Sequence, residues 1–388
     1  MIKALVSAAV TGVITGPALR LTRRTVHGLG RRLVGKRPVI EFFHQDADPY
    51  SILATHTLSP LSKAYDVDIR IWHVSPPGPR AAPEPERLGA WAARDCLRLA
   101  QAHGLDGATG DADFSGLSVE TDTGAGDDRL SRLGHYQGAM FWFEGEWYWG
   151  LDRLHHLETR LLELGLERTP GQTPLYPVRE IALEPPPSGL PRRTLNAFLS
   201  LRSPYSYIAL PRAKALSDHY GAQLRLRFVL PMVMRGLPVP PAKRRYITLD
   251  TRREADRLGL PFGRIVDPVG RGVERGLAVL HHAARQGLDY AFAHSFTRGV
   301  WAEGVDAVDD RALKALAARA GLSAAVVEAA LQDDSWRTQV EANREEMFAD
   351  GLWGVPSFRV DDPYTGPGEA VWGQDRLWQI EEDLRRPA

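Results

Sequence analysis

NAFLSLRSPYSYIAL, residues 196–210, combines a short apolar segment, a break and a helix start. Residues 197–201 are apolar enough to predict a buried strand. Ser203 stands directly before Pro204, the pattern of a helix N-cap followed by proline at the first helical position, so we expect a helix from 204 to about 220. A hydroxyl there lies beside unpaired backbone N–H groups and the positive end of the helix dipole, which favour an anion such as a thiolate. A simpler role, in which Ser203 only caps the helix, stays open.

The same pattern recurs earlier in the chain. EFFHQDADPYSILATHTLSPLSKAYDVDIRIWHVSP, which begins at Glu41, aligns without a gap with NAFLSLRSPYSYIALPRAKALSDHYGAQLRLRFVLP, which begins at Asn196. A second match, Trp-Gly-x-Asp-Arg-Leu, occurs at 149–154 and again at 372–377. The repeat predicts two halves, each built from a strand, a helix, a strand, a distal strand pair and a final helix.

This order of elements predicts a small mixed sheet in each half. A strand–helix–strand unit at this spacing indicates a right-handed crossover between parallel strands, and the late strands indicate an antiparallel hairpin. We therefore expect an α/β protein with domains at 38–168 and 193–388. A proline- and glycine-rich linker is predicted at 169–192, and a basic arm at 1–37.

The second half is longer because it carries an insertion at about 243–349 with helical periodicity. The matching part of the first half is predicted as one helix and a glycine- and aspartate-rich surface loop at 104–128. The helices expected in the insertion lie at 244–258, 272–286, 290–301, 309–320 and 323–331.

Composition indicates a soluble globular protein, with 44% hydrophobic residues and 48 basic against 48 acidic side chains. Because the net charge is zero, no nucleic-acid partner is expected. Cys96 is the single cysteine, so neither an intramolecular disulfide nor a Cys-x-x-Cys redox pair can form, and the predicted compartment is the cytoplasm. The adjacent pairs His155-His156 and His281-His282 point about 100° apart on predicted helices and are poor chelators, so no metal is predicted.

The arm at 1–37 joins an apolar run at 4–19 to a basic segment, with no acidic residue before Glu41. Gly12, Gly16 and Pro17 interrupt the apolar run, which is too short to span a bilayer comfortably and lacks a small-x-small cleavage site. We expect either a helix docked on the body or a frayed arm, with weak membrane contact as the alternative.

The second half resembles the family of 2-hydroxychromene-2-carboxylate isomerases and kappa-class glutathione transferases, which have a DsbA-like thioredoxin fold with a helical insertion. The resemblance covers about 193–384, and the first half looks like a degenerate copy. It therefore implies two tandem thioredoxin-like domains. The motifs that carry it are SPYSY at 203–207, KRRY at 243–246, LPF at 260–262, WAEG at 301–304, GVPSF at 354–358 and WGQDRL at 372–377.

The resemblance implies a glutathione site. Ser203 matches the serine that hydrogen-bonds the glutathione sulfur, and Pro356 matches a cis-proline that lets the backbone of Val355 pair with the tripeptide. Asp375, assisted by Gln374, is similar to the acid that holds the glutathione α-amino group. Lys243 is similar to a basic residue that reaches the glycine carboxylate. Each has a plain alternative in helix capping, ion pairing or a solvated charge.

The implied activity is that of a glutathione-dependent isomerase or transferase acting on an aromatic or conjugated electrophile. Such a small-molecule substrate needs an enolate donor and cationic contacts for its carboxylate. A DsbA-like protein that binds thiols or peptides without turnover is the alternative, whereas the lack of cysteine at 203 argues against a thiol oxidoreductase. The candidate residues for these substrate contacts are Arg202, Tyr205, Tyr207, Arg235, Arg244, Arg245 and Tyr246.

The first half differs from the family at two positions that are expected to form the glutathione site. Asp48 aligns with Ser203 and would repel a thiolate, and Met140 aligns with Pro356. We expect this half to be a structural or regulatory partner domain. The protein would then be a monomer whose two domains mimic a dimer, or else a homodimer.

Overall fold

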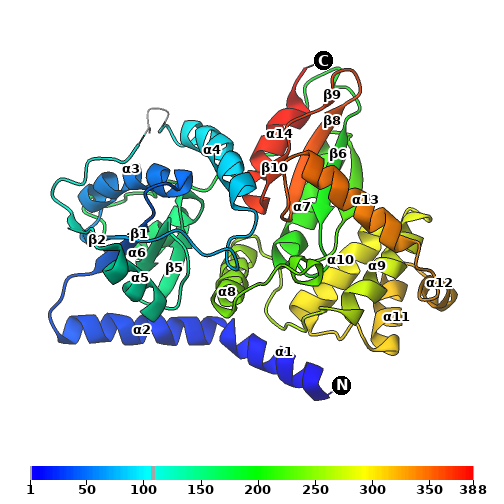
Figure 1. The fold of residues 1–388 in the computed structure, drawn as a ribbon, viewed down its shortest axis with the longest axis horizontal. Helices are drawn as coiled ribbons and strands as arrows, with labels where there is room; N and C mark the ends of the chain where they lie inside the picture. Colours follow the sequence, from blue (N-terminus) through cyan, green and yellow to red (C-terminus); the bar gives the residue numbers. More distant parts are fainter. Residues whose placement is uncertain (1, 106–109, 388) are drawn as a thin grey trace. The chain divides into compact units, whose positions relative to one another are not determined.

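A computed structural model describes residues 2–105 and 110–387, which form two compact units (Figure 1). The first unit comprises Pro17–Arg179 together with Val239–Tyr246, and the second comprises residues 2–16, Glu180–Pro238 and 247–387. These boundaries differ from those expected, because the two ends of the basic arm belong to different units and the start of the predicted insertion packs with the first unit.

The first unit is built on a mixed sheet with strand order β3-β2-β1-β4-β5. Strand β1 pairs in parallel with β2 and antiparallel with β4, as the repeat predicts. The strands are β1 (Val39–His44), β2 (Asp68–His73), β3 (Ser118–Glu120), β4 (Met140–Phe143) and β5 (Glu146–Trp149). The helices are α2 (Pro17–Leu33), α3 (Pro49–Ala64), α4 (Pro85–Ala102), α5 (Thr123–Arg132), η1 (Leu151–Arg153) and α6 (Leu154–Glu163).

The surface loop predicted at 104–128 contains regular structure. Strand β3 pairs in parallel with β2, and α5 begins at Thr123; residues 106–109 lie outside the described part of the chain. A three-residue edge strand with exposed side chains has too few buried positions to produce a detectable period, so the sequence did not predict it.

The second unit repeats this plan with strand order β10-β8-β6-β7 and β9 paired to β8. Strand β6 is parallel to β7 and antiparallel to β8. The strands are β6 (Thr194–Leu199), β7 (Gln223–Phe228), β8 (Ser357–Asp362), β9 (Gly366–Pro367) and β10 (Val371–Trp372). The main helices here are α1 (Ile2–Ile14), α7 (Pro204–His219), η4 (Gln374–Arg376) and α14 (Leu377–Arg385).

The predicted helical insertion is confirmed in outline. Helix α13 was not expected. It buries few apolar residues, and one of its buried residues is the polar Asn343, so its sequence shows only a weak apolar stripe. The insertion comprises α8 (Pro241–Arg257), α9 (Arg271–Ala284), α10 (Asp289–Arg298), the π-helical turn η3 (Gly299–Glu303), α11 (Asp310–Arg319), α12 (Ala324–Ala330) and α13 (Trp336–Ala349), after a short turn η2 (Met232–Arg235).

Both units contain the same buried tyrosine–aspartate contact. In the first unit the Tyr50 hydroxyl of α3 donates to Asp95 Oδ2 on α4 at 2.7 Å. In the second unit the Tyr205 hydroxyl of α7 donates to Asp250 Oδ2 on α8 at 2.7 Å. Both aspartates are buried. The contact therefore ties the helix after the first strand of each sheet, α3 or α7, to the helix that follows the second strand, α4 or α8.

A second contact recurs at the other end of the same helices. Tyr65 donates to Glu158 Oε1 of α6 at 3.0 Å, and Tyr220 donates to Glu381 Oε1 of α14 at 2.8 Å. Each glutamate also accepts two consecutive backbone N–H groups, those of Leu175 and Tyr176 in the first unit and of Ala182 and Leu183 in the second. The two units therefore share internal contacts as well as strand order.

Candidate functional site

Ser203 is the N-cap of α7. Its backbone is extended (φ −95°, ψ 116°), and its Oγ accepts a hydrogen bond from the backbone N–H of Ser206 at 3.1 Å. The predicted cap and the predicted helix start at Pro204 are confirmed. Because this bond uses an oxygen lone pair, the hydroxyl proton can still be donated to an anion at the helix N-terminus.

The Val355–Pro356 peptide bond is cis, as the family resemblance implies. Strand β8 begins directly after it, and the antiparallel register pairs Ser357 with Phe198 of β6. Strand β6 ends at Leu199 and leads into Ser203, so Pro356 lies beside the end of β6 from which α7 starts. The tertiary structure thus joins two motifs that are about 150 residues apart in the chain.

Gln374 and Asp375 join the same end of the sheet through η4. The backbone N–H of Gly373 donates to the carbonyl of Pro356 at 2.9 Å, which fixes η4 next to the cis-proline. Gln374 is only 1% exposed, and its amide donates to Glu254 at 3.1 Å and also contacts the Asp375 carboxylate. The buried Glu254 of α8, which no sequence motif marked, therefore helps to orient Gln374.

The residues predicted to contact substrate near Ser203 have partners within the protein. Tyr207 is buried, its hydroxyl donates to the carbonyl of Pro261 at 2.7 Å, and burial raises its pKa to about 12. Arg202 makes two hydrogen bonds to Asp267, at 2.8 and 2.7 Å, and Tyr205 donates to Asp250. A substrate would have to compete with these contacts, and the buried Tyr207 has a structural role.

Lys243, Arg244 and Tyr246 lie in the first unit, which corrects their expected place in the second domain. The Lys243 ammonium donates to the carbonyl of Ala81 at 2.8 Å, and burial lowers its pKa. Tyr246 is buried and packs edge-to-face on His135, with ring centroids 5.1 Å apart. This apolar packing holds the segment with the first unit.

Asp48 occupies the place of Ser203 in the first unit. Its backbone has nearly the same conformation (φ −92°, ψ 116°), and its carboxylate accepts the N–H of Ser51 at 3.1 Å. Burial raises the pKa of Asp48 to about 6, with the hydrogen bonds from Ser51 and Tyr50 acting in the opposite direction. The position thus keeps the cap but carries a titratable acid.

The residue that matches Pro356 in the first unit is Ala139, which corrects the expected match with Met140. Strand pairing places Met140 opposite Phe43, just as Ser357 lies opposite Phe198. The carbonyl of Ala139 also accepts the N–H of Gly150 at 2.8 Å, the counterpart of the bond that Pro356 makes. Ala139 has a left-handed backbone (φ 56°), so a different local conformation replaces the cis-proline.

Replacing Asp48 with asparagine should stabilise the first unit at pH 8 but not at pH 4. The folded-state pKa lies above the ordinary value of 3.8, so the protonated form contributes stability that is complete below about pH 4 and is lost as the pH rises through 6. Asparagine is neutral and also caps helices, so it should raise the free energy of unfolding at pH 8 by roughly 2–3 kcal/mol. Urea unfolding at the two pH values measures this.

Asp122→Asn is the matched control, because Asp122 is also an N-cap but is exposed to solvent. It should shift stability little at either pH. An equal effect of Asp48→Asn at pH 4 and pH 8 would show that the carboxyl is not titrating as described.

The second half of the chain is similar to known proteins. The sequence profile of the DSBA-like thioredoxin domain matches residues 194–385. The 2-hydroxychromene-2-carboxylate isomerase of Pseudomonas putida is 25% identical over 201 residues, which covers 50% of this chain and 94% of that enzyme. The enzyme of the same name from Pseudomonas sp. (strain C18) is 24% identical over 196 residues, covering 48% of this chain and 88% of the enzyme.

Solved structures also resemble the same half. A 2-hydroxychromene-2-carboxylate isomerase superposes with a TM-score of 0.41 at 20% identity, covering 49% of this chain and 94% of that structure. The cytosolic disulfide reductase DsbM from Pseudomonas aeruginosa superposes with a TM-score of 0.41 at 23% identity, covering 50% of this chain and 95% of DsbM. The profile match and the observed topology show that residues 194–385 have a DsbA-like thioredoxin fold.

Proposed function

We propose that the second unit is a glutathione-dependent isomerase or transferase that acts on an aromatic or conjugated electrophile. The observation that carries the proposal is a serine hydroxyl, not a cysteine thiol, at the N-terminus of α7 beside the cis Val355–Pro356 bond. A hydroxyl and a helix N-terminus stabilise a bound thiolate but cannot form a disulfide with it. The isomerase relatives, matched over nearly their whole length, support the same reaction class.

When bound, glutathione would supply a thiolate able to add reversibly to the carbon–carbon double bond of an enone, which would allow rotation about that bond before the thiolate leaves again. Ser203 donates to the sulfur in the resting complex. Val355 pairs its backbone with the tripeptide, and Asp375 holds its α-ammonium group.

Calorimetry with glutathione on the full chain, followed by turnover of a panel of conjugated enones, tests the proposal. Binding together with isomerisation or adduct formation is the expected result. No binding at millimolar glutathione would overturn it, and binding without turnover of any enone would favour the non-catalytic thiol- or peptide-binding protein.

We also propose that the two units arose by duplication and that the first serves as a structural or regulatory partner of the second. The recurring Tyr–Asp and Tyr–Glu contacts and the shared strand order support this origin. Asp48 in place of Ser203 is unfavourable for a thiolate, which supports a non-catalytic first unit. We expect a monomer, and light scattering after size exclusion would detect a dimer instead.

The orientation of the two N-terminal helices supports contact with a membrane surface from the cytoplasm. In both helices, polar side chains point toward the rest of the protein. In α1 the Ser7 hydroxyl donates to the carbonyl of Ile265 at 3.1 Å, and Thr11 Oγ1 accepts the N–H of the same residue at 2.9 Å. In α2, Arg24 pairs with Glu146 at 3.0 Å and Arg31 with Glu144 at 2.7 Å. A surface helix normally buries its apolar face, so this arrangement is reversed.

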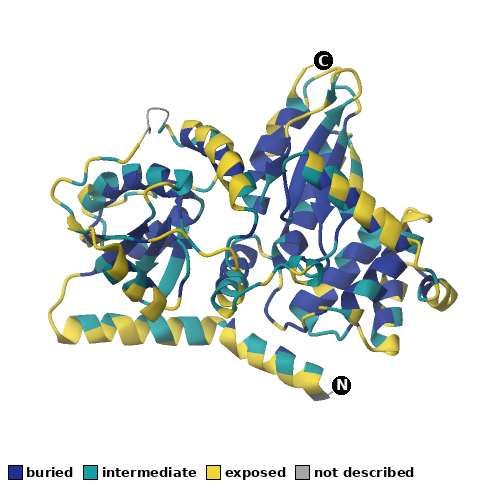
Figure 2. Cartoon of the chain, viewed as in Figure 1, coloured by how far each residue is buried: buried dark blue, intermediate teal, exposed yellow. Residues whose placement is uncertain are grey.

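Most of the large apolar side chains of both helices face solvent instead, and Figure 2 shows α2 with exposed and half-buried residues along its length. Lys3–Leu33 is long and apolar enough to cross a membrane by length and composition. The break at Gly16–Pro17, together with the exposed Arg32 and half-buried Arg23 of α2, favours a helix lying in the plane of an anionic lipid surface. The exposed side chains are Leu5, Val6, Val10, Val13 and Ile14 on α1 and Leu21, Val26, Leu29 and Leu33 on α2.

The chain should co-sediment with vesicles that contain phosphatidylglycerol and much less with pure phosphatidylcholine, and added salt should release it. Replacing Leu21 and Leu29 with glutamate should abolish sedimentation, because charge is added to the apolar face. Leu97→Glu is the control, since Leu97 is 73% exposed on α4, outside these helices. Wild-type protein that stays in solution with both lipids would contradict membrane contact and favour a protein partner for this face.

A further inference from the structure

Two histidines end the paired strands of the first unit. His44 is the last residue of β1 and His73 the last of β2, and they lie opposite each other in the parallel register. Asp46 lies two residues after the end of β1, and Asp111 approaches the imidazole of His44. These groups gather where the carboxyl ends of parallel strands meet, the usual position of binding sites in such sheets.

The donor atoms of these four side chains lie close enough together to converge on one ion. His44 Nε2 lies 3.4 Å from Asp46 Oδ1 and 3.1 Å from Asp111 Oδ1, and His73 Nδ1 lies 2.7 Å from Asp46 Oδ1. One donor atom each from His44, Asp46 and His73 lie within 4.8 Å of one another. In a tetrahedral site with bonds of about 2.0–2.2 Å, donor atoms are roughly 3.3–3.6 Å apart. The two His44 distances are close to this spacing, whereas the 2.7 Å contact between His73 and Asp46 is a hydrogen bond that must lengthen when the ion binds.

The imidazole of His44 is buried with its outer nitrogen unsatisfied. The residue is 0% exposed, and Nε2 makes no hydrogen bond, because its approaches to the two aspartates lack hydrogen-bond geometry. The other nitrogen, Nδ1, lies 2.9 Å from Ser51 Oγ, which fixes the ring as the outer hydrogen bond of a metal-bound histidine does.

The second unit shows that the fold does not need polar groups here. Leu199 and Phe228 occupy the same register positions at the ends of β6 and β7, and both are buried. We propose that the first unit binds a divalent transition metal ion of the zinc class through His44, Asp46 and His73, with Asp111 as the fourth ligand. Imidazole and carboxylate together suit zinc and its neighbours, whereas magnesium and calcium prefer oxygen alone.

Titration of the full chain, free of any histidine tag, with Zn²⁺ in a calorimeter tests this site. We expect one ion per chain, and Co²⁺ in place of Zn²⁺ should give a visible absorption spectrum. The double variant His44→Leu/His73→Phe installs the residues of the second unit and should weaken binding at least about 100-fold, because two of the ligands are lost. Ser51→Ala should weaken it by about 10–100-fold, the usual effect of losing an outer hydrogen bond.

His219→Ala, which removes an imidazole from the second unit, should leave the affinity unchanged. If the double variant does not fold, Asp46→Asn decides instead, because the Asp46 side chain is 68% exposed and its loss should weaken binding without disturbing packing. Failure of wild-type protein to bind Zn²⁺ stoichiometrically, or equal affinity of wild type and the ligand variants, would overturn the proposal. These outcomes do not depend on the glutathione site.

Discussion

Replacing Ser203 with alanine is expected to lower kcat/KM for glutathione-dependent turnover by about 10²–10³-fold, the usual cost of losing a donor aimed at a reacting anion. The variant removes the only side-chain oxygen at the N-cap of α7, and with it the proposed donor to the sulfur. Steady-state turnover of an accepted enone measures the effect, and calorimetry reports the accompanying loss of glutathione affinity.

Loss of the helix cap must be separated from loss of the donor. Alanine at an N-cap costs about 1 kcal/mol of stability, so Ser203→Ala should also unfold slightly earlier. Ser203→Asp is the matched variant, because Asp48 caps the equivalent helix with the same backbone conformation. It should keep wild-type stability at pH 4, where a carboxyl in this position is protonated, and still lose activity at neutral pH, since its charge repels the thiolate. Retention of turnover in Ser203→Ala within a factor of three would remove Ser203 from the mechanism.

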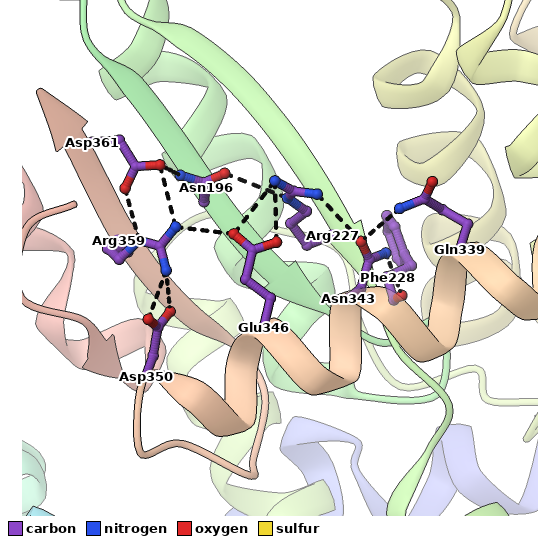
Figure 3. A network of polar contacts seen from close by, with 9 residues as sticks. All are labelled: Asn196, Arg227, Phe228, Gln339, Asn343, Glu346, Asp350, Arg359 and Asp361. Atoms are coloured by element: carbon purple, nitrogen blue, oxygen red, sulfur yellow. Dashed lines mark hydrogen bonds and ion pairs between the residues drawn. The ribbon is translucent and has the colours of Figure 1, made fainter. Parts of the chain in front are cut away.

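Replacing Arg359 with methionine should lower the free energy of unfolding of the second unit by about 3 kcal/mol, since removing one partner of a buried ion pair leaves uncompensated charge. Arg359 lies on β8, is 6% exposed, and contacts Asp350 at 2.6 Å, Glu346 at 2.9 Å and Asp361 at 2.7 Å (Figure 3). Methionine fills much of the volume but leaves the three carboxylates without their shared cation. Urea unfolding followed by tryptophan fluorescence measures the change.

The network around Arg359 joins α13 to the strand that follows Pro356. Glu346 of α13 also pairs with Arg227 of β7, so it bridges two strands (Figure 3). Arg344→Ala on the exposed side of α13 is the control and should change stability by less than about 0.5 kcal/mol. Adding Asp350→Asn to Arg359→Met should recover part of the loss, because burial already disfavours that carboxylate and raises its pKa. An effect of Arg359→Met no larger than the control would show that the network adds no net stability.

Features that depend on near neighbours were predictable from the sequence. The cap at Ser203, the start of α7 at Pro204 and five of the insertion helices follow from capping patterns and apolar periods within one or two turns. The parallel pairs β1–β2 and β6–β7 followed from the repeat combined with the handedness of parallel crossovers, whereas the edge strand β3 did not. The sequence also shows that position 48 carries a carboxylate. The raised pKa of this group results from burial, which the sequence does not reveal.

Features that depend on contacts between distant segments were decided only by the tertiary structure. Strand register, not alignment, identified Ala139 as the counterpart of Pro356, and packing against His135 placed Tyr246 and its neighbours in the first unit. His44 and His73 carry no motif spacing, and only the pairing of β1 with β2 brings them together. The sequence by itself determined which local elements form and where Ser203 stands. Which side chains share a site was decided by the tertiary structure, because that depends on how distant strands and helices pack.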